Sequence, residues 1–534
     1  MGRVVTWTAI LAMASAVAGY AQAVATPYPV ADKSVAELQA DMASGRVTSE
    51  ALVRAYLDRI AALDRGGPGL HSIIALNPLA LAQARALDRA RRAGGTTGPL
   101  YGVPVLVKDN IETADPVATT AGSLALKDNL TRRDAPIVAR LRAAGAVILG
   151  KTNLSEWANI RSSRSISGWS AIGGLVKNPY ALDRNACGSS SGSGAAMAAG
   201  LAALAIGTET NGSITCPSSI DGVVGLKPTV GLLSRTHIVP ISHTQDTPGP
   251  MGRSVADVAA MLTVMAGSDP ADMATQDADA HRVDYLAGLE AASLRGVRLG
   301  VLRPSDASMA ELVLFQRTLD ALKAAGAVLV EVEAPRLPQL EEQETLILNT
   351  ELKADLNAYL ATTPPQVTAR TLADLIAFDG ASARELALFG QETFKKAQQT
   401  KGLGDPEYLR ARAAAQRAAG PDGIDRLLAE HGLDALVAPT TGPAWRTDVV
   451  EGDNAQGSAS GLPAIAGYPH LSLPMGYVHG LPVGLSFIGP AWSEARLLRF
   501  GYAFEQQVHA RLPPDFRPSV ENDPAIAPLL APLP

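Results

Sequence analysis

Apolar positions in the first third of the chain recur with helical spacing and then form short continuous runs. Val35 to Asp64 has the spacing of two short amphipathic helices separated by Gly45, with Thr48 or Ser49 as the cap of the second. The run from Tyr101 to Lys108 (YGVPVLVK) is apolar and ends in a lysine, which predicts a buried strand. The same patterns predict a helix from Leu79 to Ala93, a helix capped by Asp134 with Pro136 in its first turn and Gly145 at its end, and the strand AVILG that follows.

Strands and helices also alternate in the second half of the chain. Residues 296–333 contain strand GVRLGVL, a helical stretch from Ala310 to Ala325, and strand AVLVEVE. Residues 335–430 show mostly helical spacing, which predicts a peripheral helical lobe. Further predicted elements are strands at Leu433–Pro439, His470–Met475 and Pro482–Ile488 and a closing helix at Glu494–His509. This alternation predicts an α/β fold.

The first residues have the pattern of a secretory signal. Arg3 precedes an apolar run from Val4 to Gly19, shorter than the roughly 18–20 residues that a membrane span needs. The sequences AQA and AVA between residues 21 and 25 fit a cleavage site. We therefore expect a signal peptide at residues 1–25 and a domain at residues 26–534. That domain is expected to be exported to a bacterial periplasm or secreted, with no membrane association; an uncleaved anchor is the alternative.

Composition limits the class of protein. Hydrophobic residues make up 47% of the 534 residues, enough for a large core, which excludes a disordered chain. Lys+Arg number 46 and Asp+Glu 52, a formal charge of −6 with no basic block, which argues against nucleic acid as a partner. Two cysteines cannot form a disulfide framework, and no metal-ligand spacing is present. We expect neither a metal nor another cofactor.

Lys108 is the first candidate for chemistry, because it ends an apolar strand. Burial disfavours the charged ammonium, and a neutral lysine is a base. An ordinary lysine paired with Asp109 at a strand edge is the alternative.

Residues 178–219 form a second candidate region, rich in glycine and serine. One helix-like segment, Gly194 to Ala203, has small residues that favour close helix packing over substrate contact. Residues 187–194 read CGSSSGSG, which fits a linker, a phosphate loop without its Walker lysine, or the G-x-S-x-G elbow of α/β-hydrolases. The elbow needs an apolar strand before it, and Pro179 to Ala186 does not have that pattern.

Residues 207–213 read GTETNGS, so Ser213 follows an Asn-Gly turn. Backbone N–H groups could converge there on an oxyanion, although a plain loop is the alternative. The histidines offer little support for a Ser-His-Asp triad: His470 and His509 are the candidates, with Ser190 as the matching serine. His237 and His243 are expected in loops rather than as ligands.

Together these motifs resemble the amidase signature family, from roughly Ser34 to Ala510. The lysine strand VPVLVKDN and the signature ACGSSSGSGAAMAAGLAALAIGTETNGSITCP stand in the family's order. They are followed by DGVVGLKPTVGLLSR, DTPGPM, DALVAPT, GLPAIAGYPHLSLPMG and LPVGLSFIGP. The resemblance implies one large domain with a central mixed twisted sheet flanked by helices.

The family's Ser-Ser-Lys triad, carried over residue by residue, falls on Lys108, on Ser189 as the bridging serine and on Ser213 as the nucleophile. In the family the peptide bond of the bridging serine is cis. The resemblance places the oxyanion N–H groups on Thr210, Asn211, Gly212 and Ser213. Two positions depart from the family's pattern: Thr215 stands where many members have arginine, and Asn211 where glycine is common.

The segments SEWANIRSS, SISGWSAIGG, CGSSSGS and ITCP resemble bacterial peptide amidases more than the transamidase branch. The resemblance implies an amidohydrolase that converts a carboxamide into a carboxylate and ammonia through an acyl-enzyme. Peptides with a C-terminal amide are the favoured substrates, and the helical lobe is expected to line their pocket. A broad aliphatic or aryl acylamidase and a non-catalytic periplasmic binding protein of the same fold are the alternatives. A monomer or homodimer is expected.

Cys187 and Cys216 stand close in sequence to Ser189 and Ser213. If the two serines touch, the thiols lie near each other, and an oxidising compartment would permit a bridge. Backbone geometry decides whether it forms. Our expectation from the sequence is two buried free thiols.

Overall fold

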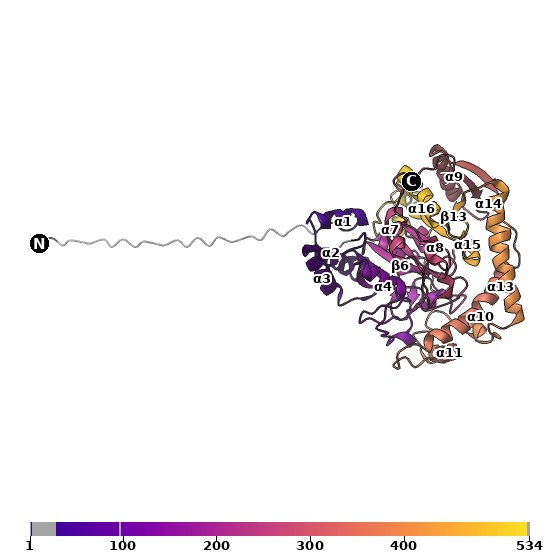
Figure 1. The fold of residues 1–534 in the computed structure, drawn as a ribbon, viewed down its shortest axis with the longest axis horizontal. Helices are drawn as coiled ribbons and strands as arrows, with labels where there is room; N and C mark the ends of the chain where they lie inside the picture. Colours follow the sequence, from indigo (N-terminus) through magenta and orange to yellow (C-terminus); the bar gives the residue numbers. More distant parts are fainter. Residues whose placement is uncertain (1, 3–27, 96–97, 531–534) are drawn as a thin grey trace.

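The computed structural model describes Gly2, residues 28–95 and residues 98–530 (Figure 1). The predicted signal peptide, residues 1–25, lies outside the described residues apart from Gly2 and stays a prediction. In the described part of the chain, no helix has both the length and the apolar character needed to cross a bilayer.

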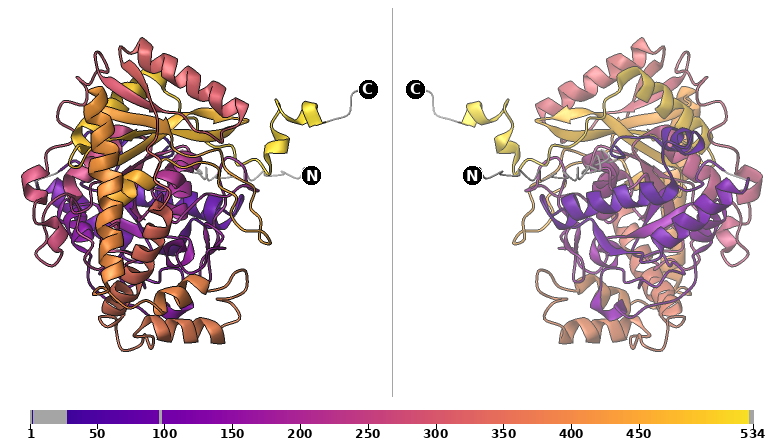
Figure 2. Two further views of the ribbon diagram at one scale, coloured as in Figure 1. Left: turned by 90° about the vertical axis from the view of Figure 1, so that its right-hand side faces the viewer. Right: turned by 90° about the vertical axis from the view of Figure 1, so that its left-hand side faces the viewer.

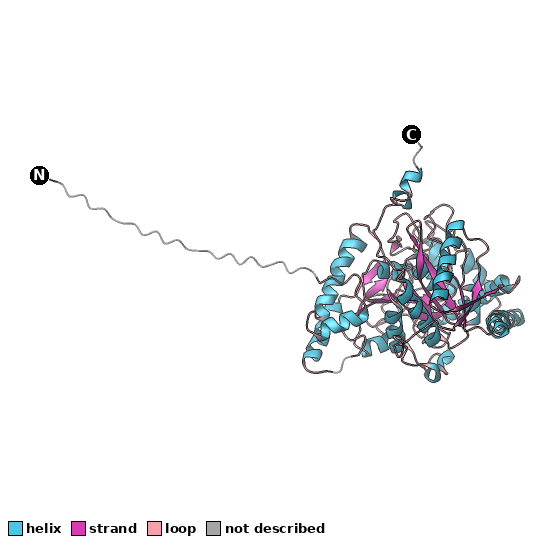
Figure 3. Ribbon diagram, turned by 90° about the horizontal axis from the view of Figure 1, so that it is seen from above, coloured by secondary structure: helices cyan, strands magenta, loops and turns pink. Residues whose placement is uncertain are grey.

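One mixed sheet forms the centre of the molecule, with helices around it (Figure 3). Within the described residues its eleven strands run in the order β1-β3-β2-β6-β8-β7-β12-β13-β11-β9-β10. Neighbours are parallel from β3 to β6 and from β11 to β10, and antiparallel elsewhere. The strands are β1 (Ile73–Leu76), β2 (Pro104–Lys108), β3 (Val147–Thr152), β6 (Leu204–Glu209), β7 (Val224–Lys227), β8 (Thr247–Gly252), β9 (Arg298–Leu302), β10 (Val328–Val332), β11 (Ala435–Pro439), β12 (His470–Val478) and β13 (Leu481–Ile488), with β4 (Trp169–Ser170) and β5 (Gly174–Leu175) paired separately. The predicted α/β fold, a mixed sheet flanked by helices, is confirmed.

The helices between β10 and β11 gather on one side of the molecule. Helices α10 to α14 form the flank at the right and bottom of Figure 1, and Figure 2 shows the same orange helices from two further sides. The helices are α1 (Val35–Ala43), α2 (Ser49–Arg59), α3 (Ala80–Arg92), α4 (Pro136–Ala143), α5 (Ser191–Ala198), α6 (Thr215–Ile220), α7 (Val255–Met265), α8 (Ala278–His281), α9 (Met309–Ala324), α10 (Leu340–Leu360), α11 (Leu372–Ala381), α12 (Glu392–Gln398), α13 (Pro406–Ala419), α14 (Arg426–His431), α15 (Gly461–Ala466), α16 (Glu494–Val508) and α17 (Ala527–Leu530). The helical spacing of residues 335–430 thus corresponds to five helices in the described structure.

The pairing of β2 with β6 brings the two candidate regions together. The strands are parallel, with Val107 opposite Ile206. Parallel neighbours end at the same edge of a sheet. Lys108 at the end of β2 therefore lies beside Thr208 near the end of β6.

Two predicted helix ends can be compared with the structure. Thr48 caps α2, since its hydroxyl accepts a hydrogen bond from the N–H of Ala51 at 3.1 Å. Asp134 does not cap α4, so that prediction is wrong: the helix starts without a side-chain cap, with Pro136 as its first residue. The Asp134 carboxylate instead pairs with Arg142 at 2.9 Å, because a guanidinium binds a carboxylate more strongly than a neutral N–H does.

Helix α5 starts three residues earlier than the predicted Gly194–Ala203 segment and ends at Ala198. All of its residues are buried. A Cβ atom on Gly192 would lie 2.3 Å from the carbonyl oxygen of Ser72 and 2.4 Å from that of Asn153. The small residues therefore let the helix closely approach the backbone next to the ends of β1 and β3, as expected for close packing.

Replacing Gly192 with alanine should destabilise the protein. Alanine favours a helix over glycine by about 0.5–1 kcal/mol, but overpacking against fixed backbone typically costs about 1–3 kcal/mol or more. Gly380 in α11 is the matched control, because it is exposed and a Cβ there meets only Gln391 at 3.9 Å. Denaturant unfolding should show a loss for Gly192→Ala and no loss for Gly380→Ala. Equal stability of the two variants would contradict the packing argument.

Candidate active site

Lys108 lies in a fully buried pocket lined by hydroxyl groups. Its Nζ is 2.7 Å from the Oγ of Ser189, 3.0 Å from that of Ser190 and 2.8 Å from the Oγ1 of Thr208. Among the described residues, no carboxylate pairs with it; Asp109, the alternative partner from the sequence, pairs with Lys151 instead, at 3.2 Å. The edge-paired reading of Lys108 is therefore wrong.

Burial lowers the pKa of Lys108 to about 7. Desolvation is the main cause, because the ammonium loses its hydration and gains no contacting anion. The carboxylates of Asp246 and Glu209 act in the opposite direction from a distance. A large fraction of Lys108 is therefore neutral near pH 7, as a base requires.

Ser189 belongs to the Gly/Ser segment and contacts Lys108. Its side chain is fully buried, and the peptide bond between Gly188 and Ser189 is cis, as the family resemblance implies. The carbonyl oxygen of Ser189 accepts a hydrogen bond from the N–H of Ser155 at 3.1 Å. Ser189 is thus fixed by contacts on both its backbone and its side chain.

Ser213 lies next to this loop and just before α6. Its carbonyl oxygen accepts a hydrogen bond from the N–H of Ser190 at 3.1 Å, so the two serine-bearing segments are neighbours. Ser213 is 8% exposed, which leaves a small opening at its position. In residues 28–95 and 98–530, the backbone N–H groups of residues 210–213 donate to no protein acceptor. We call residues 210–213 the oxyanion loop, since unpaired donors beside a serine can bind an oxyanion.

Glu209 fixes the end of the oxyanion loop. Its carboxylate accepts hydrogen bonds from the N–H groups of Ile214 at 2.7 Å and Thr215 at 2.8 Å. The Thr215 hydroxyl lies 3.2 Å from the same oxygen. Threonine at the position where many relatives carry arginine therefore completes a local network. Glu209 is not among the site residues predicted from the sequence, although it stands inside GTETNGS.

The serine–histidine alternative has no geometric support. The Ser190 hydroxyl contacts Lys108 and donates to the carbonyl oxygen of Thr208 at 3.1 Å. His470 lies 2.6 Å from Ser486 instead, and burial lowers its pKa to about 3. His509 is exposed at the end of α16. Neither candidate histidine is among the hydrogen-bond partners of Ser190.

A family model described as amidase matches residues 51–498. The chain belongs to the amidase signature family. It is an amide-hydrolysing enzyme, and its structure resembles those of bacterial peptide amidase. The native peptide amidase of Stenotrophomonas maltophilia is 54% identical, with a TM-score of 0.87 over 92% of this chain and 100% of that chain.

Two further relatives extend the comparison. The structure of peptide amidase in complex with the competitive inhibitor chymostatin is also 54% identical, with a TM-score of 0.87 over 91% of this chain and all of that one. A probable amidase of Arabidopsis thaliana is 39% identical over 501 residues, which cover 92% of each chain. Similarity over nearly the whole length means that this amidase shares the complete domain of its relatives.

Cys187 and Cys216 form a disulfide in this amidase, so the expectation of two free thiols is wrong. Their Cα atoms lie 6.1 Å apart. The hydrogen bond from Ser190 to Ser213 holds the segments of Cys187 and Cys216 side by side. The sequence positions of the cysteines do not show this alignment. The bridge joins the segment of Ser189 to the helix that follows Ser213, and such bridges persist in oxidising compartments.

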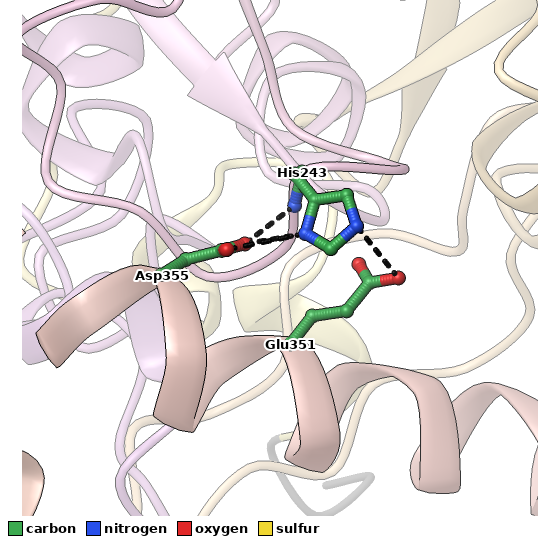
Figure 4. A group of neighbouring side chains, drawn as sticks. All are labelled: His243, Glu351 and Asp355. Carbon is green, nitrogen blue, oxygen red and sulfur yellow. Dashed lines mark hydrogen bonds and ion pairs between the residues drawn. The ribbon is translucent and has the colours of Figure 1, made fainter. Parts of the chain in front are cut away.

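His243 lies in the loop before β8, as expected, between two carboxylates of α10 (Figure 4). Its Nδ1 is 2.9 Å from Asp355, and its Nε2 is 3.6 Å from Glu351. The hydrogen bond to Asp355 raises the pKa of His243. These atoms lie within 4.8 Å of one another, close enough to share a metal ion. Because each ring nitrogen already faces a carboxylate, we interpret the group as an ion pair.

A cavity of about 350 Å³ lies beside the site. Its lining includes Asn110, Thr208 and Thr210 near the site. It also includes the loop at residues 235–243 and Asp355 of α10. The cavity thus joins the end of β6 to the helical side of the molecule. From the sequence, the helical lobe was expected to line the substrate pocket. The loop at residues 235–243 was not predicted to do so, because its residues match no chemical motif.

Opening the disulfide should weaken the protein. Closing a loop of this length typically contributes about 2–4 kcal/mol to the free energy of unfolding. We expect Cys216→Ser to lose about that amount in denaturant unfolding. Thiol titration of the denatured wild type should find no free thiol without reductant and both thiols with it. Two thiols in the untreated protein would contradict the bridge.

Proposed function

We propose that this amidase removes the C-terminal amide group of peptides, with Lys108, Ser189 and Ser213 as its catalytic triad. The observation that carries the proposal is the contact of 2.7 Å between the buried Nζ of Lys108 and the hydroxyl of Ser189. A base without a counter-ion beside a hydroxyl is the arrangement that activates a serine. The similarity to peptide amidase over the whole domain supports the substrate class.

The first half of the proposed reaction forms an acyl-enzyme. Neutral Lys108 accepts the proton of the Ser189 hydroxyl while Ser189 accepts that of Ser213. The Ser213 oxygen attacks the carbonyl carbon of the amide, and the N–H groups of residues 210–213 stabilise the oxyanion. Removal of one such donor typically costs about 10²–10³ in kcat. The proton returns through Ser189 to the nitrogen, the C–N bond breaks and ammonia leaves.

The second half consumes water. Lys108, neutral again, draws a proton through Ser189 from a water molecule, which attacks the ester carbon. The bond to Ser213 breaks, and the proton taken from water returns through Ser189 to the Ser213 oxygen. The peptide leaves as a carboxylic acid, which loses its remaining proton to solvent, so a carboxylate replaces the amide. Apart from the substrate and water, the proposed steps use only side chains and backbone N–H groups of the enzyme.

A panel of substrates tests the proposal. We expect ammonia release from peptide amides to exceed release from short aliphatic amides and amine release from anilides, with internal peptide bonds left intact. Ser213→Ala should lower kcat by at least about 10⁴-fold, since the nucleophile is lost. Thr215→Ser, which keeps the hydroxyl beside Glu209, is the matched control. Comparable rates on anilides would favour the broad acylamidase, and no turnover of any amide would favour the binding protein.

The activity should rise with pH. Because the neutral form of Lys108 is the base and its pKa lies at about 7, kcat/KM should increase as the pH passes through about 7. Asp246→Asn removes a carboxylate that raises this pKa, so the midpoint should move to lower pH. A profile that is flat between about pH 5 and 9 would contradict the role of Lys108.

A further inference from the structure

The side chain of Asn211 is held at both ends by hydrogen bonds. Its Nδ2 donates to the Oε1 of Glu344 on α10 at 2.8 Å. Its Oδ1 accepts a hydrogen bond from the hydroxyl of Ser460 at 2.6 Å, and Ser460 lies 2.8 Å from Ser458. The amide plane is therefore fixed between the helical side and the segment before α15. The backbone of the same residue supplies part of the oxyanion loop.

Glu344 reaches the oxyanion loop by a second path. The same Oε1 accepts a hydrogen bond from the Nε2 of Gln245 at 2.9 Å, and this nitrogen also lies 3.4 Å from the carbonyl oxygen of Thr210. Gln245 is buried. The Oε1 atom of Glu344 thus accepts hydrogen bonds from the side-chain amides of Asn211 and Gln245. Asn211 belongs to the oxyanion loop, and Gln245 contacts the backbone of Thr210, the residue before Asn211.

Two other carboxylates of α10 fix the segment that carries Gln245. Glu351 accepts hydrogen bonds from the hydroxyls of Ser242 and Thr244, the latter at 2.9 Å, and Asp355 accepts the N–H of His243 at 2.8 Å. Positions 344, 351 and 355 follow helical spacing, so they lie on one face of α10. Figure 4 shows Glu351 and Asp355 pointing from this face to His243. The segment therefore lies between α10 and the oxyanion loop.

We propose that Glu344 is a positioning residue, which acts through Asn211 and Gln245 to hold the oxyanion loop in its reactive shape. The inference rests on the proposed function, in which the N–H groups of residues 210–213 stabilise the oxyanion. Gly212 within the loop has a φ of +83°, and a Cβ atom there would lie 3.1 Å from Ser460. Gly212 has no side chain that could hold the loop in place. Glu209 fixes the end of the loop, and the contacts of Asn211 with Glu344 and Ser460 hold its middle.

Replacing Glu344 separates positioning from binding. A shift of about 1 Å in a catalytic group can cost about 10²-fold in rate. We expect Glu344→Ala to lower kcat on a peptide amide by about 10- to 100-fold with KM changed by less than about 3-fold. Glu344→Gln keeps Oε1 as the acceptor of both amides and should restore kcat to within about 3-fold of wild type. Glu342→Ala, an exposed carboxylate of the same helix, should have no effect.

A second readout keeps the proposal open to refutation where a variant loses stability. A peptide aldehyde adds its carbonyl carbon to the Ser213 oxygen and places an oxyanion against the loop, whereas the matched peptide alcohol binds without this adduct. In Glu344→Ala the inhibition constant of the aldehyde should rise at least about 10-fold and that of the alcohol less than about 2-fold.

Equal weakening of aldehyde and alcohol, or a glutamine variant as slow as the alanine variant, would overturn the positioning role. If wild type released no ammonia from any peptide amide, the proposed function would fail. The aldehyde and alcohol pair would still decide the role of Glu344, since this comparison needs no turnover.

Discussion

The structure of the site depends on one desolvated amine. Lys108 is surrounded by hydroxyl groups and has no contacting carboxylate among the described residues, so its charge is not compensated. The parallel pairing of β2 with β6 places the amine at a sheet edge beside the two serine-bearing segments. Lys108 is fully buried, and this loss of hydration keeps its pKa low.

The remaining contacts serve to keep serines and amide donors in place around that amine. Glu209 accepts a hydrogen bond at the start of α6, and the disulfide links the segments of Ser189 and Ser213. Glu344 of α10 accepts a hydrogen bond from Asn211. These restraints come from three separate parts of the chain: the segment of Cys187, residues 209–216 and α10. The small residues of the signature allow close approach of the backbone, and their hydroxyls add hydrogen bonds, such as those of Ser190 to Thr208 and of Ser193 to Ile206.

The sequence was most informative where chemistry or apolar runs are local. It predicted β2, the strand after Gly145 and the residues of the candidate site, the last through the family resemblance. Strands β6, β7 and β8 were not predicted. Glycine and proline, at positions such as Gly207, Pro248 and Pro250, are uncommon within strands and interrupt the apolar pattern. The disulfide and the hydrogen bond between Asn211 and Glu344 join residues far apart in the chain. Local sequence patterns do not predict such contacts.

Direct titration of the Lys108 side chain tests the central claim. In protein labelled at the lysine side chains, the resonance of Lys108 can be assigned by its loss in Lys108→Met and followed with pH by NMR. We expect a midpoint at about 7, so that the amine is mostly neutral at higher pH. A midpoint near the ordinary lysine value of about 10.4 would contradict it, because Lys108 would then be a charged group unable to accept a proton.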